Sequence, residues 1–465
     1  MRSSKSLLDL TAHHAAAYLD TIDARPIATT AGIDELRRLL GGPLPETPAN
    51  AMEVIDNLVR DTAGGLLGST NPRFFGWVIG GTLPVALAAD WLTSTWDQNA
   101  ASNVTAPAEA VVEEVSGAWL KQLLGLPDSA SFAFVTGCQM AHTTALAAAR
   151  HKLLRDRQWN VETDGLSGAP QLRIFTTESR HESILRSVRL LGIGTRAIRL
   201  VAADTDGRID CAALDHALAA EKGAPAIVIL QAGDLNTGLF DPFEAAIAIA
   251  HAHGAWVHID GAFGLWAATS EKHRHLLAGA EKANSWATDG HKWLNVPFES
   301  GFVFVADAAA HRAAFTQSTS YSVPSAGLRD QKDWNPEWSR RGRAFATYAA
   351  IRGLGRRGIA EIVDRCSAHA ARLVSEIGAL PGGEVLARPI INQGLVRFRR
   401  PDGHHDDYTD RVIAAIQTDG VAWFGGVTWR GQRAMRVSVC NWATTEADVA
   451  ATVASVRKVL GAMGS

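Results

Sequence analysis

The middle of the chain alternates short apolar runs with helix-like stretches, and this alternation constrains the possible folds more than any other feature of the sequence. Successive strands separated by helices need crossover connections, which place the strands parallel and the helices on both faces of the sheet. We therefore predict an α/β domain built on a mostly parallel central sheet. The expected strands are residues 132–135, 173–176, 197–201, 226–230, 256–259 and 301–305.

Polar or small residues follow several apolar runs, at the points where strands would end. Gly137, Asn236, Asp260 and Lys292 each come after such a run. In an open α/β sheet, ligands bind in the crevice outside the carboxyl ends of the strands. We therefore expect these four residues to meet in one cleft.

Lys292 and Asp260 are the charged members of this group, and their types suggest a chemistry. Lys292 lies in the segment Ala-Thr-Asp-Gly-His-Lys-Trp-Leu-Asn-Val-Pro at 287–297, and its amine can form a Schiff base with an aldehyde. Asp260 follows the apolar run 256–259, as expected where a buried strand delivers a carboxylate to a cleft. Each residue has an ordinary alternative, a solvated lysine and an aspartate that caps the next helix.

A possible phosphate site precedes both residues in the sequence. The run 132–135 leads into a tight turn at Gly137 and then into an alanine-rich helix through Arg150. The free N–H groups and the positive dipole end of a helix start favour an anion. Phosphate site, lysine and buried carboxylate together suggest pyridoxal phosphate (PLP), because the carboxylate would keep the pyridine nitrogen protonated and make the ring a stronger electron sink.

Four further segments carry a family resemblance. They are Asn-Pro-Arg-Phe-Phe-Gly at 71–76, Val-Thr-Ala-Pro-Ala-Glu at 104–109, Arg-His-Glu-Ser-Ile at 180–184 and Asp-Gly-His-Lys-Trp-Leu at 289–294. In this order and at these separations they resemble the group II PLP-dependent amino-acid decarboxylases, which have the aspartate aminotransferase fold (PLP fold type I). The resemblance covers nearly everything from about residue 71 onward.

The resemblance implies a role for each residue of the cleft. Lys292 would bind the aldehyde and Asp260 the pyridine nitrogen, with Ala262 packing under the ring and His181 on its opposite face. A histidine at this place could otherwise be an ordinary helix-start residue. The residues implied for the phosphate and the ring hydroxyl are Gly137, Cys138, Gln139, Asp289 and His291 for the phosphate, and Asn236 or Thr237 for the hydroxyl.

The implied reaction is decarboxylation of an L-amino acid to its amine, through a Schiff base on Lys292 and a quinonoid intermediate. Phe74, Phe75 and Trp77 would line the substrate pocket, although aromatic residues at such spacing are more often core residues. Arg436 could hold a substrate carboxylate or pair with an acidic neighbour. Aromatic, acidic and non-proteinogenic amino acids all remain open as substrates.

One departure from the family pattern bears on the reaction. The aromatic amino acid enzymes carry a mobile-loop tyrosine at a place that corresponds, counting back from Trp334, to Gln331. Glutamine cannot act as a general acid, so either Tyr321 or His181 returns the proton, or the chemistry differs. The alternatives are oxidative decarboxylation or deamination to an aldehyde, and transamination. A catalytically silent PLP-binding protein is a further alternative, against which the intact lysine and aspartate speak.

Three regions are predicted along the chain: an N-terminal helical segment at 1–80, a large PLP-binding domain at 81–333 and a small α+β domain at 334–465. The N-terminal segment is divided by prolines and is too short to form a core of its own. In the family such a segment wraps around a second subunit. We therefore expect a homodimer, with packing of these helices on their own subunit as the alternative.

Composition argues against several classes of protein. A net charge of −3, from 48 acidic and 45 basic residues, gives no electrostatic case for binding nucleic acid or an anionic membrane. The sequence shows neither a signal peptide at its start nor an apolar run of about 20 residues that could span a membrane. The four cysteines have no paired spacing, which argues against a metal site or a disulfide framework and fits a reducing, cytoplasmic compartment.

Overall fold

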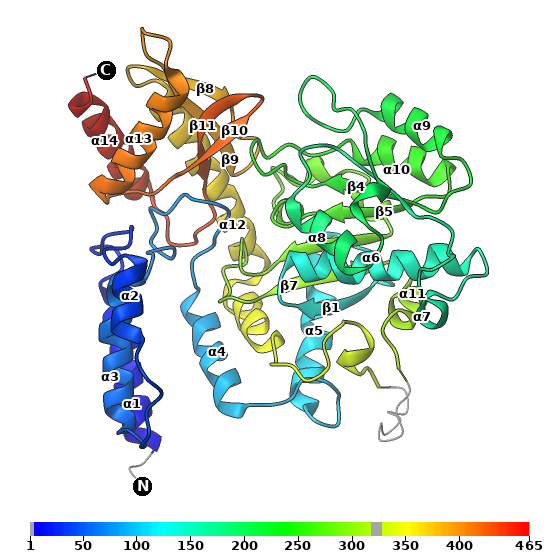
Figure 1. The fold of residues 1–465 in the computed structure, drawn as a ribbon, viewed down its shortest axis with the longest axis horizontal. Coiled ribbons are helices and arrows are strands. Elements are labelled where there is room, and N and C mark those ends of the chain that lie inside the picture. Colours follow the sequence, from blue (N-terminus) through cyan, green and yellow to red (C-terminus); the bar gives the residue numbers. More distant parts are fainter. Residues whose placement is uncertain (1–3, 318–327, 465) are drawn as a thin grey trace.

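The computed structural model describes residues 4–317 and 328–464 (Figure 1). Tyr321, a residue expected to take part in proton return, lies outside the described residues. In Figure 1 the large sheet and its helices fill the right of the view, and the small C-terminal sheet lies at the upper left. The N-terminal helices stand at the lower left, beside the rest of the molecule.

The central sheet has seven strands in the order β1-β7-β6-β5-β4-β2-β3. The five strands from β6 to β3 in this order run parallel, and β7 runs antiparallel between β1 and β6. The predicted α/β fold with a mostly parallel sheet is therefore confirmed. The strands are β1 (Ser131–Val135), β2 (Arg173–Thr176), β3 (Ile198–Leu200), β4 (Ala226–Gln231), β5 (Trp256–Asp260), β6 (Ser285–Asp289) and β7 (Gly301–Val305).

Side chains of the central strands alternate between two hydrophobic clusters, one on each face of the sheet. In β4, Val228 and Leu230 belong to the first cluster, whereas Ile227 and Ile229 belong to the second. Strands buried on both faces read as continuous apolar runs, which is why the sequence revealed them. The first face is covered by α5 (Pro107–Leu124), α9 (Cys211–Ala220) and α10 (Phe243–Ala252), and the second by α6 (Cys138–Arg155) and α8 (Glu182–Leu190).

Strand β6 was not among the predicted strands, because polar residues interrupt its sequence. Ser285 and Thr288 are fully buried in it. Ser285 Oγ accepts a hydrogen bond from Trp256 Nε1 at 2.9 Å, so the polar side chain is satisfied inside the sheet. A strand of this kind carries no apolar run, although it occupies the middle of the sheet.

The C-terminal part forms an antiparallel sheet in the order β10-β11-β9-β8. Strand β10 begins at Gly425, and just before it Trp423 forms an isolated bridge with Phe74. The elements are β8 (Gly383–Ala387), β9 (Gln393–Phe398), β10 (Gly425–Trp429), β11 (Gln432–Ser438), α13 (His405–Asp419) and α14 (Glu446–Ala462).

Helix α12 (Ala344–Gly378) joins the two parts of the molecule. Its first half packs against α4 (Pro84–Trp96) and α5, and its second half lies against β8 and β9. Gly355 has φ 61° and ψ 175°, which bends the helix between these halves. The remaining short elements are α7 (Val161–Asp164), α11 (Ala308–Ala313), η1 (Ala63–Gly65), η2 (Thr195–Ala197), η3 (Gly264–Thr269), η4 (Arg274–Leu277), η5 (Ala280–Lys282) and η6 (Gln331–Asp333).

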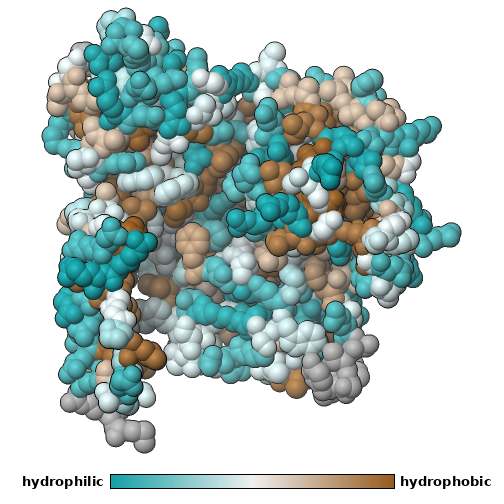
Figure 2. Space-filling model, viewed as in Figure 1, coloured by the Kyte–Doolittle hydropathy of each residue, from teal (hydrophilic) through white to brown (hydrophobic). Residues whose placement is uncertain are grey.

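The N-terminal helices α1 (Ser4–Asp20), α2 (Ile33–Leu40) and α3 (Ala51–Thr62) contain no buried residue. A groove of about 740 Å³ lies between α1, α3 and α4 and is lined mainly by apolar side chains. Figure 2 shows hydrophobic residues on the side of these helices that faces the rest of the molecule. Within residues 4–317 and 328–464, none of the helices combines the length and the hydropathy that a membrane span requires.

Candidate active site

A cavity of about 540 Å³ lies at the carboxyl ends of β4, β5 and β6. Strand ends of a parallel sheet meet at one edge, which is why residues far apart in the sequence gather here. Most of the site residues predicted from the sequence line it, namely Trp77, Gly137, Cys138, Gln139, His181, Asp260, Ala262, Asp289, His291 and Lys292.

Lys292 lies in the turn between β6 and β7 and points its amine at a carboxylate. Its Nζ is 3.1 Å from Asp289 Oδ2. Burial alone would lower the pKa of Lys292, but the negative charge of Asp289, with a smaller contribution from Asp260, raises it above the ordinary value. The amine is therefore held as an ammonium ion at neutral pH in the described state.

Asn295 holds the turn that carries Lys292. Its backbone has φ 54°, a left-handed conformation that asparagine tolerates better than most residues. The side-chain Oδ1 accepts from Gly81 N at 2.6 Å and from Trp442 N at 3.0 Å, while Nδ2 donates to Trp293 O at 2.9 Å and Cys440 O at 3.2 Å. One buried side chain thus ties the lysine turn to two distant segments. Sequence reasoning missed this residue, and its only signal was an asparagine just after the lysine motif.

Asp260 ends β5 and turns its carboxylate into the cavity. Its Oδ1 accepts from Ala262 N at 3.2 Å, and its Oδ2 lies 3.5 Å from His142 Nε2. Burial alone would raise the pKa of Asp260, but His142, His181 and Lys292 hold it well below its usual range. The carboxylate is therefore ionised and free to meet a cation in the cavity.

The start of α6 also lines the cavity. Cys138 N donates to Asp289 Oδ1 at 2.6 Å, so a carboxylate already occupies part of the positive end of this helix. A Cβ on Gly137 would lie 3.1 Å from His291 Cε1. Gln139 turns its amide away from the cavity and donates to Ser187 Oγ at 2.9 Å.

Two of the histidines that line the cavity, His181 and His291, have defined tautomers. His181 caps α8, where its Nδ1 accepts from Ser183 N at 3.2 Å, and burial lowers its pKa. His291 Nδ1 accepts from Ser300 N at 3.2 Å, its ring stacks on Phe298, and burial lowers its pKa as well. Because each Nδ1 accepts a hydrogen bond, each neutral ring carries its proton on Nε2.

Some predicted residues do not line the cavity. Thr237 donates from its hydroxyl to Asp234 Oδ1 at 2.8 Å, and Asn236 donates to the same oxygen from its backbone N at 2.9 Å. Phe74 stacks on Trp423 with ring centroids 4.9 Å apart, and Phe75 is likewise a buried core residue. Neither pair is in the cavity wall.

Trp77 and Arg436 also line the cavity. Trp77 is 51% exposed, has φ 49° and stacks on Trp423 at 4.9 Å between centroids. Arg436 is 8% exposed, and its pKa is lowered by burial and partly restored by Asp234. Within the part of the chain that the structure describes, no hydrogen bond fixes its guanidinium. The wall therefore offers a substrate both an aromatic surface and a cation.

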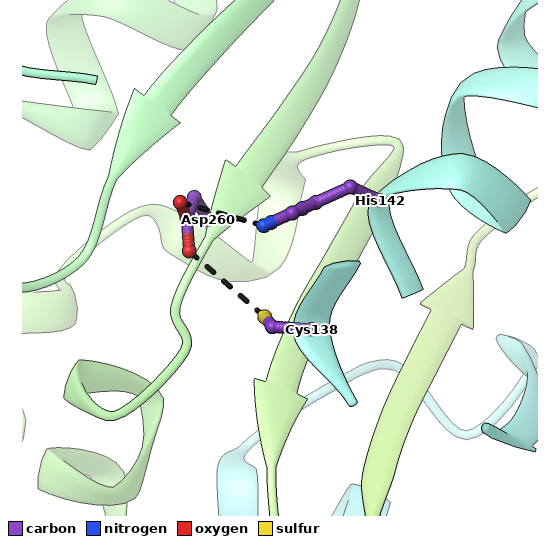
Figure 3. A group of neighbouring side chains, drawn as sticks. All are labelled: Cys138, His142 and Asp260. Atoms are coloured by element: carbon purple, nitrogen blue, oxygen red, sulfur yellow. Dashed lines mark hydrogen bonds and ion pairs between the residues drawn. The ribbon is translucent and has the colours of Figure 1, made fainter. Parts of the chain in front are cut away.

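Cys138, His142 and Asp260 form a compact group on one wall of the cavity (Figure 3). Their sulfur, nitrogen and oxygen atoms lie within 4.8 Å of one another, with Cys138 Sγ 4.0 Å from Asp260 Oδ1. Two of them stand one helical turn apart on α6, so linear cysteine spacing could not reveal the group. Burial raises the pKa of the Cys138 thiol well above its ordinary value, which keeps it protonated and a poor metal ligand.

The residues present fit PLP. The cavity provides an amine for the aldehyde, a buried ionised carboxylate for the pyridine nitrogen and a helix start for the phosphate, all around one space of about 540 Å³. A neutral histidine, His181, lies in the same wall.

Comparison with known proteins agrees with this geometry. The model of the pyridoxal-dependent decarboxylase conserved domain matches residues 34–400. The aromatic-L-amino-acid decarboxylase of Bacillus atrophaeus is 27% identical over 389 residues, which cover 82% of this chain and 78% of that protein. The cysteine sulfinic acid decarboxylase of Mus musculus is 28% identical over 440 residues, covering 90% and 87%.

Solved structures show the same fold. The Oryza sativa TDC, solved with PLP and tryptamine, superposes with a TM-score of 0.92 at 22% identity, covering 99% of this chain and 98% of that one. The 4-hydroxyphenylacetaldehyde synthase of Rhodiola rosea superposes with a TM-score of 0.89 at 21% identity, with coverage of 99% and 98%. Proteins named for different products thus share this architecture.

Proposed function

Because the chain belongs to the pyridoxal-dependent decarboxylase family, we propose that it converts an L-amino acid to the corresponding amine with release of CO₂. The chain is a PLP-dependent carboxy-lyase, as its family model and its decarboxylase relatives establish. The observation that carries the proposal is the arrangement of Lys292, Asp260 and the start of α6 around one cavity.

When bound, PLP supplies an electron-withdrawing ring that stabilises the electron pair left at the substrate Cα as CO₂ departs. Asp260 would hold the ring nitrogen in its protonated form, because its own carboxylate is ionised and shielded from water. His181 would cover the ring face opposite Ala262 and present Nε2–H. Gly137 and the first N–H groups of α6 would hold the phosphate, with His291 beside them.

Lys292 would hold the aldehyde carbon of the cofactor. Its ammonium must lose a proton before the amine can attack, and Asp289, 3.1 Å away, is the group that retains it in the protonated form. After a substrate amine displaces Lys292, the free amine can again hold a proton beside Asp289. Lys292 is therefore placed to return a proton to the substrate.

The source of that proton separates two outcomes. Gln331 is buried, lies outside the cavity wall and has no acidic proton to give. If none of Lys292, His181 and Tyr321 delivers a proton, we infer a second candidate function, oxidative decarboxylation, in which dioxygen takes up two electrons and the products are an aldehyde, CO₂, ammonia and peroxide. Support for it comes from Gln331 and from the fold shared with the Rhodiola rosea aldehyde synthase.

The test is to incubate the PLP-loaded protein with pooled aromatic and acidic amino acids in air and to identify the products by mass spectrometry. An amine with loss of CO₂ is expected, and its identity names the substrate class that Trp77 or Arg436 selects. Aldehyde with peroxide would overturn the proposal in favour of the second function, and a keto acid would overturn it in favour of transamination. The Tyr321→Phe variant then tests whether Tyr321 returns the proton, since amine formation that persists in it leaves this role to Lys292 or His181.

Borohydride reduction tests the assignment of Lys292 independently of turnover. Reduction should fix the cofactor on the peptide that contains Lys292, and the Lys292→Ala variant should retain none after denaturation. Lys272→Ala is the matched control, since this lysine is 74% exposed and should behave like wild type. Cofactor trapped on a different lysine would refute the assignment.

We also propose that residues 1–80 form the contact of a homodimer. Three helices with no buried residue and an apolar groove of about 740 Å³ beside them support a second copy as the occupant. Sedimentation equilibrium should give twice the chain mass, and Leu58→Glu, at a half-exposed apolar position of α3, should shift it towards the monomer. A monomeric wild-type protein at micromolar concentration would refute this.

A further inference from the structure

A line of buried hydrogen-bonding groups runs from the core of the sheet to Asp260. Trp256 Nε1 donates to Ser285 Oγ at 2.9 Å, and Ser285 Oγ lies 2.9 Å from His258 Nδ1. His258 Nε2 lies 2.9 Å from His142 Nδ1, and His142 Nε2 lies 3.5 Å from Asp260 Oδ2. Figure 3 shows His142 reaching from α6 towards Asp260 at the end of β5.

The two ends of this line fix the direction of its hydrogen bonds. Trp256 can only donate, and an ionised Asp260 can only accept. When both histidines are neutral, Ser285 donates to His258 Nδ1, and His258 Nε2–H donates to His142 Nδ1. The proton of His142 is then on Nε2, which faces Asp260. The reverse order would place a lone pair of a neutral His142 against the carboxylate.

His258 favours this order because it stays neutral. Its burial, and then the nearby His142, lower the pKa of His258 to about 3. If His142 took up a proton, His258 would have to turn its own proton towards Ser285, and His142 Nε2–H would still face Asp260. In both arrangements, therefore, Asp260 meets a donor and never a lone pair.

His142 Nε2 faces Asp260 Oδ2 and has no hydrogen-bond partner elsewhere among the described residues. It is fully buried and makes no hydrogen bond within the described residues, and the 3.5 Å to Asp260 Oδ2 is an ion-pair distance.

We propose that His142, backed by His258 and Ser285, is a positioning residue that keeps Asp260 ionised and aimed at the pyridine nitrogen of PLP. The inference rests on the assignment of Asp260 in the proposed function. Connected hydrogen bonds in a buried site polarise one another. A substitution at Ser285 should therefore alter the interaction between His142 and Asp260, because His258 connects Ser285 to His142. If His142 and His258 only packed in the core, a substitution at Ser285 would leave Asp260 unchanged.

Two amide substitutions at position 142 distinguish a positioning role of His142 from simple core packing. A glutamine amide at position 142 extends about as far as Nε2, whereas an asparagine amide extends only about as far as Nδ1. His142→Asn should weaken PLP binding to the apoprotein about tenfold, because Asp260 loses the group that orients it, and His142→Gln should restore most of the affinity. Binding is measured by absorbance titration, and the pH dependence of the spectrum of bound PLP should shift in His142→Asn alone.

Ser285→Ala is the second variant, and Asp260→Asn the reference. Ser285→Ala should also weaken PLP binding, by two- to fivefold. If His142→Asn does not fold, this variant tests the positioning role instead. An Asp260→Asn protein that binds PLP like wild type would refute the assignment of Asp260 itself. Weak binding by Asp260→Asn, together with unchanged binding and spectra in His142→Asn or Ser285→Ala, would overturn only the present inference. Titrations are repeated with EDTA, because an effect that vanishes there would assign Cys138, His142 and Asp260 to a metal ion and also overturn it.

Discussion

Replacing Asn295 with alanine should destabilise the protein by about 5 kcal/mol and loosen the turn that carries Lys292. The side chain makes four buried hydrogen bonds, and each contributes about 1 kcal/mol net, so their loss costs about 4 kcal/mol. Alanine in the left-handed conformation at φ 54° adds roughly 1 kcal/mol. Asn295→Gly loses the same hydrogen bonds but avoids this strain, so it should be the milder variant by about 1 kcal/mol.

Thermal unfolding of the apoprotein, followed by circular dichroism, measures both differences. A chain of 465 residues has an unfolding entropy of about 1 kcal/mol/K, from roughly 2 cal/mol/K per residue. The midpoint should therefore fall by about 5 °C in Asn295→Ala and by about 4 °C in Asn295→Gly. PLP binding should weaken in both variants, because Lys292 loses its fixed position. A midpoint within about 1 °C of wild type, or a glycine variant less stable than the alanine variant, would refute the reasoning.

Three further predictions follow from the buried charges and the close packing. Burial raises the pKa of Glu109 from 4.5 to about 7, so the native state binds more protons than the unfolded state and loses up to about 3 kcal/mol of stability as pH rises through that window. Urea midpoints of Glu109→Gln should lack this slope, and an unchanged slope would contradict the assignment. The raised pKa of Lys292 predicts that the rate of PLP incorporation climbs with pH above neutrality, and Asp289→Asn should shift the rise to lower pH; a rate independent of pH argues otherwise. Gly301→Ala would bring a Cβ within 2.4 Å of Gly137 Cα, so PLP affinity should drop at least tenfold and stability by about 1–3 kcal/mol, and wild-type affinity would exclude this packing role.

Residues that follow apolar strands could be predicted from the sequence because the strand rule is local. Asp260 and Gly137 each come directly after or close to a recognisable run, and a parallel sheet brings strand ends together wherever they stand in the chain. Lys292 follows the polar strand β6 and was predicted from its own motif instead. The same rule suggested Asn236, yet the loop after β4 turns this residue towards Asp234. A loop conformation depends on its own hydrogen bonds, which a strand pattern does not contain.

Contacts made across the fold could not be predicted in this way. Asn295 acts through Gly81 and Trp442, and His142 through His258 on a neighbouring strand. Neither pairing leaves a periodic or spaced pattern in the sequence. Polar strand β6 was missed for a related reason, since Ser285 is tolerated there only because it receives a hydrogen bond from Trp256.

The position of β1 at the edge of the central sheet has a consequence for protein synthesis. Among the described residues β7 is the one strand beside it, and Ser131 bonds to Val305 across 174 residues of sequence. At about 5–20 residues per second, a ribosome needs roughly 9–35 s to make the partner after β1 has emerged. Throughout that interval β1 has no strand to pair with and exposes Phe132, Phe134 and Val135. An unpaired apolar strand of this kind can aggregate or bind a chaperone. The turn at Gly137 follows β1 directly, so the growing chain can acquire its cofactor site only after β7 has been translated.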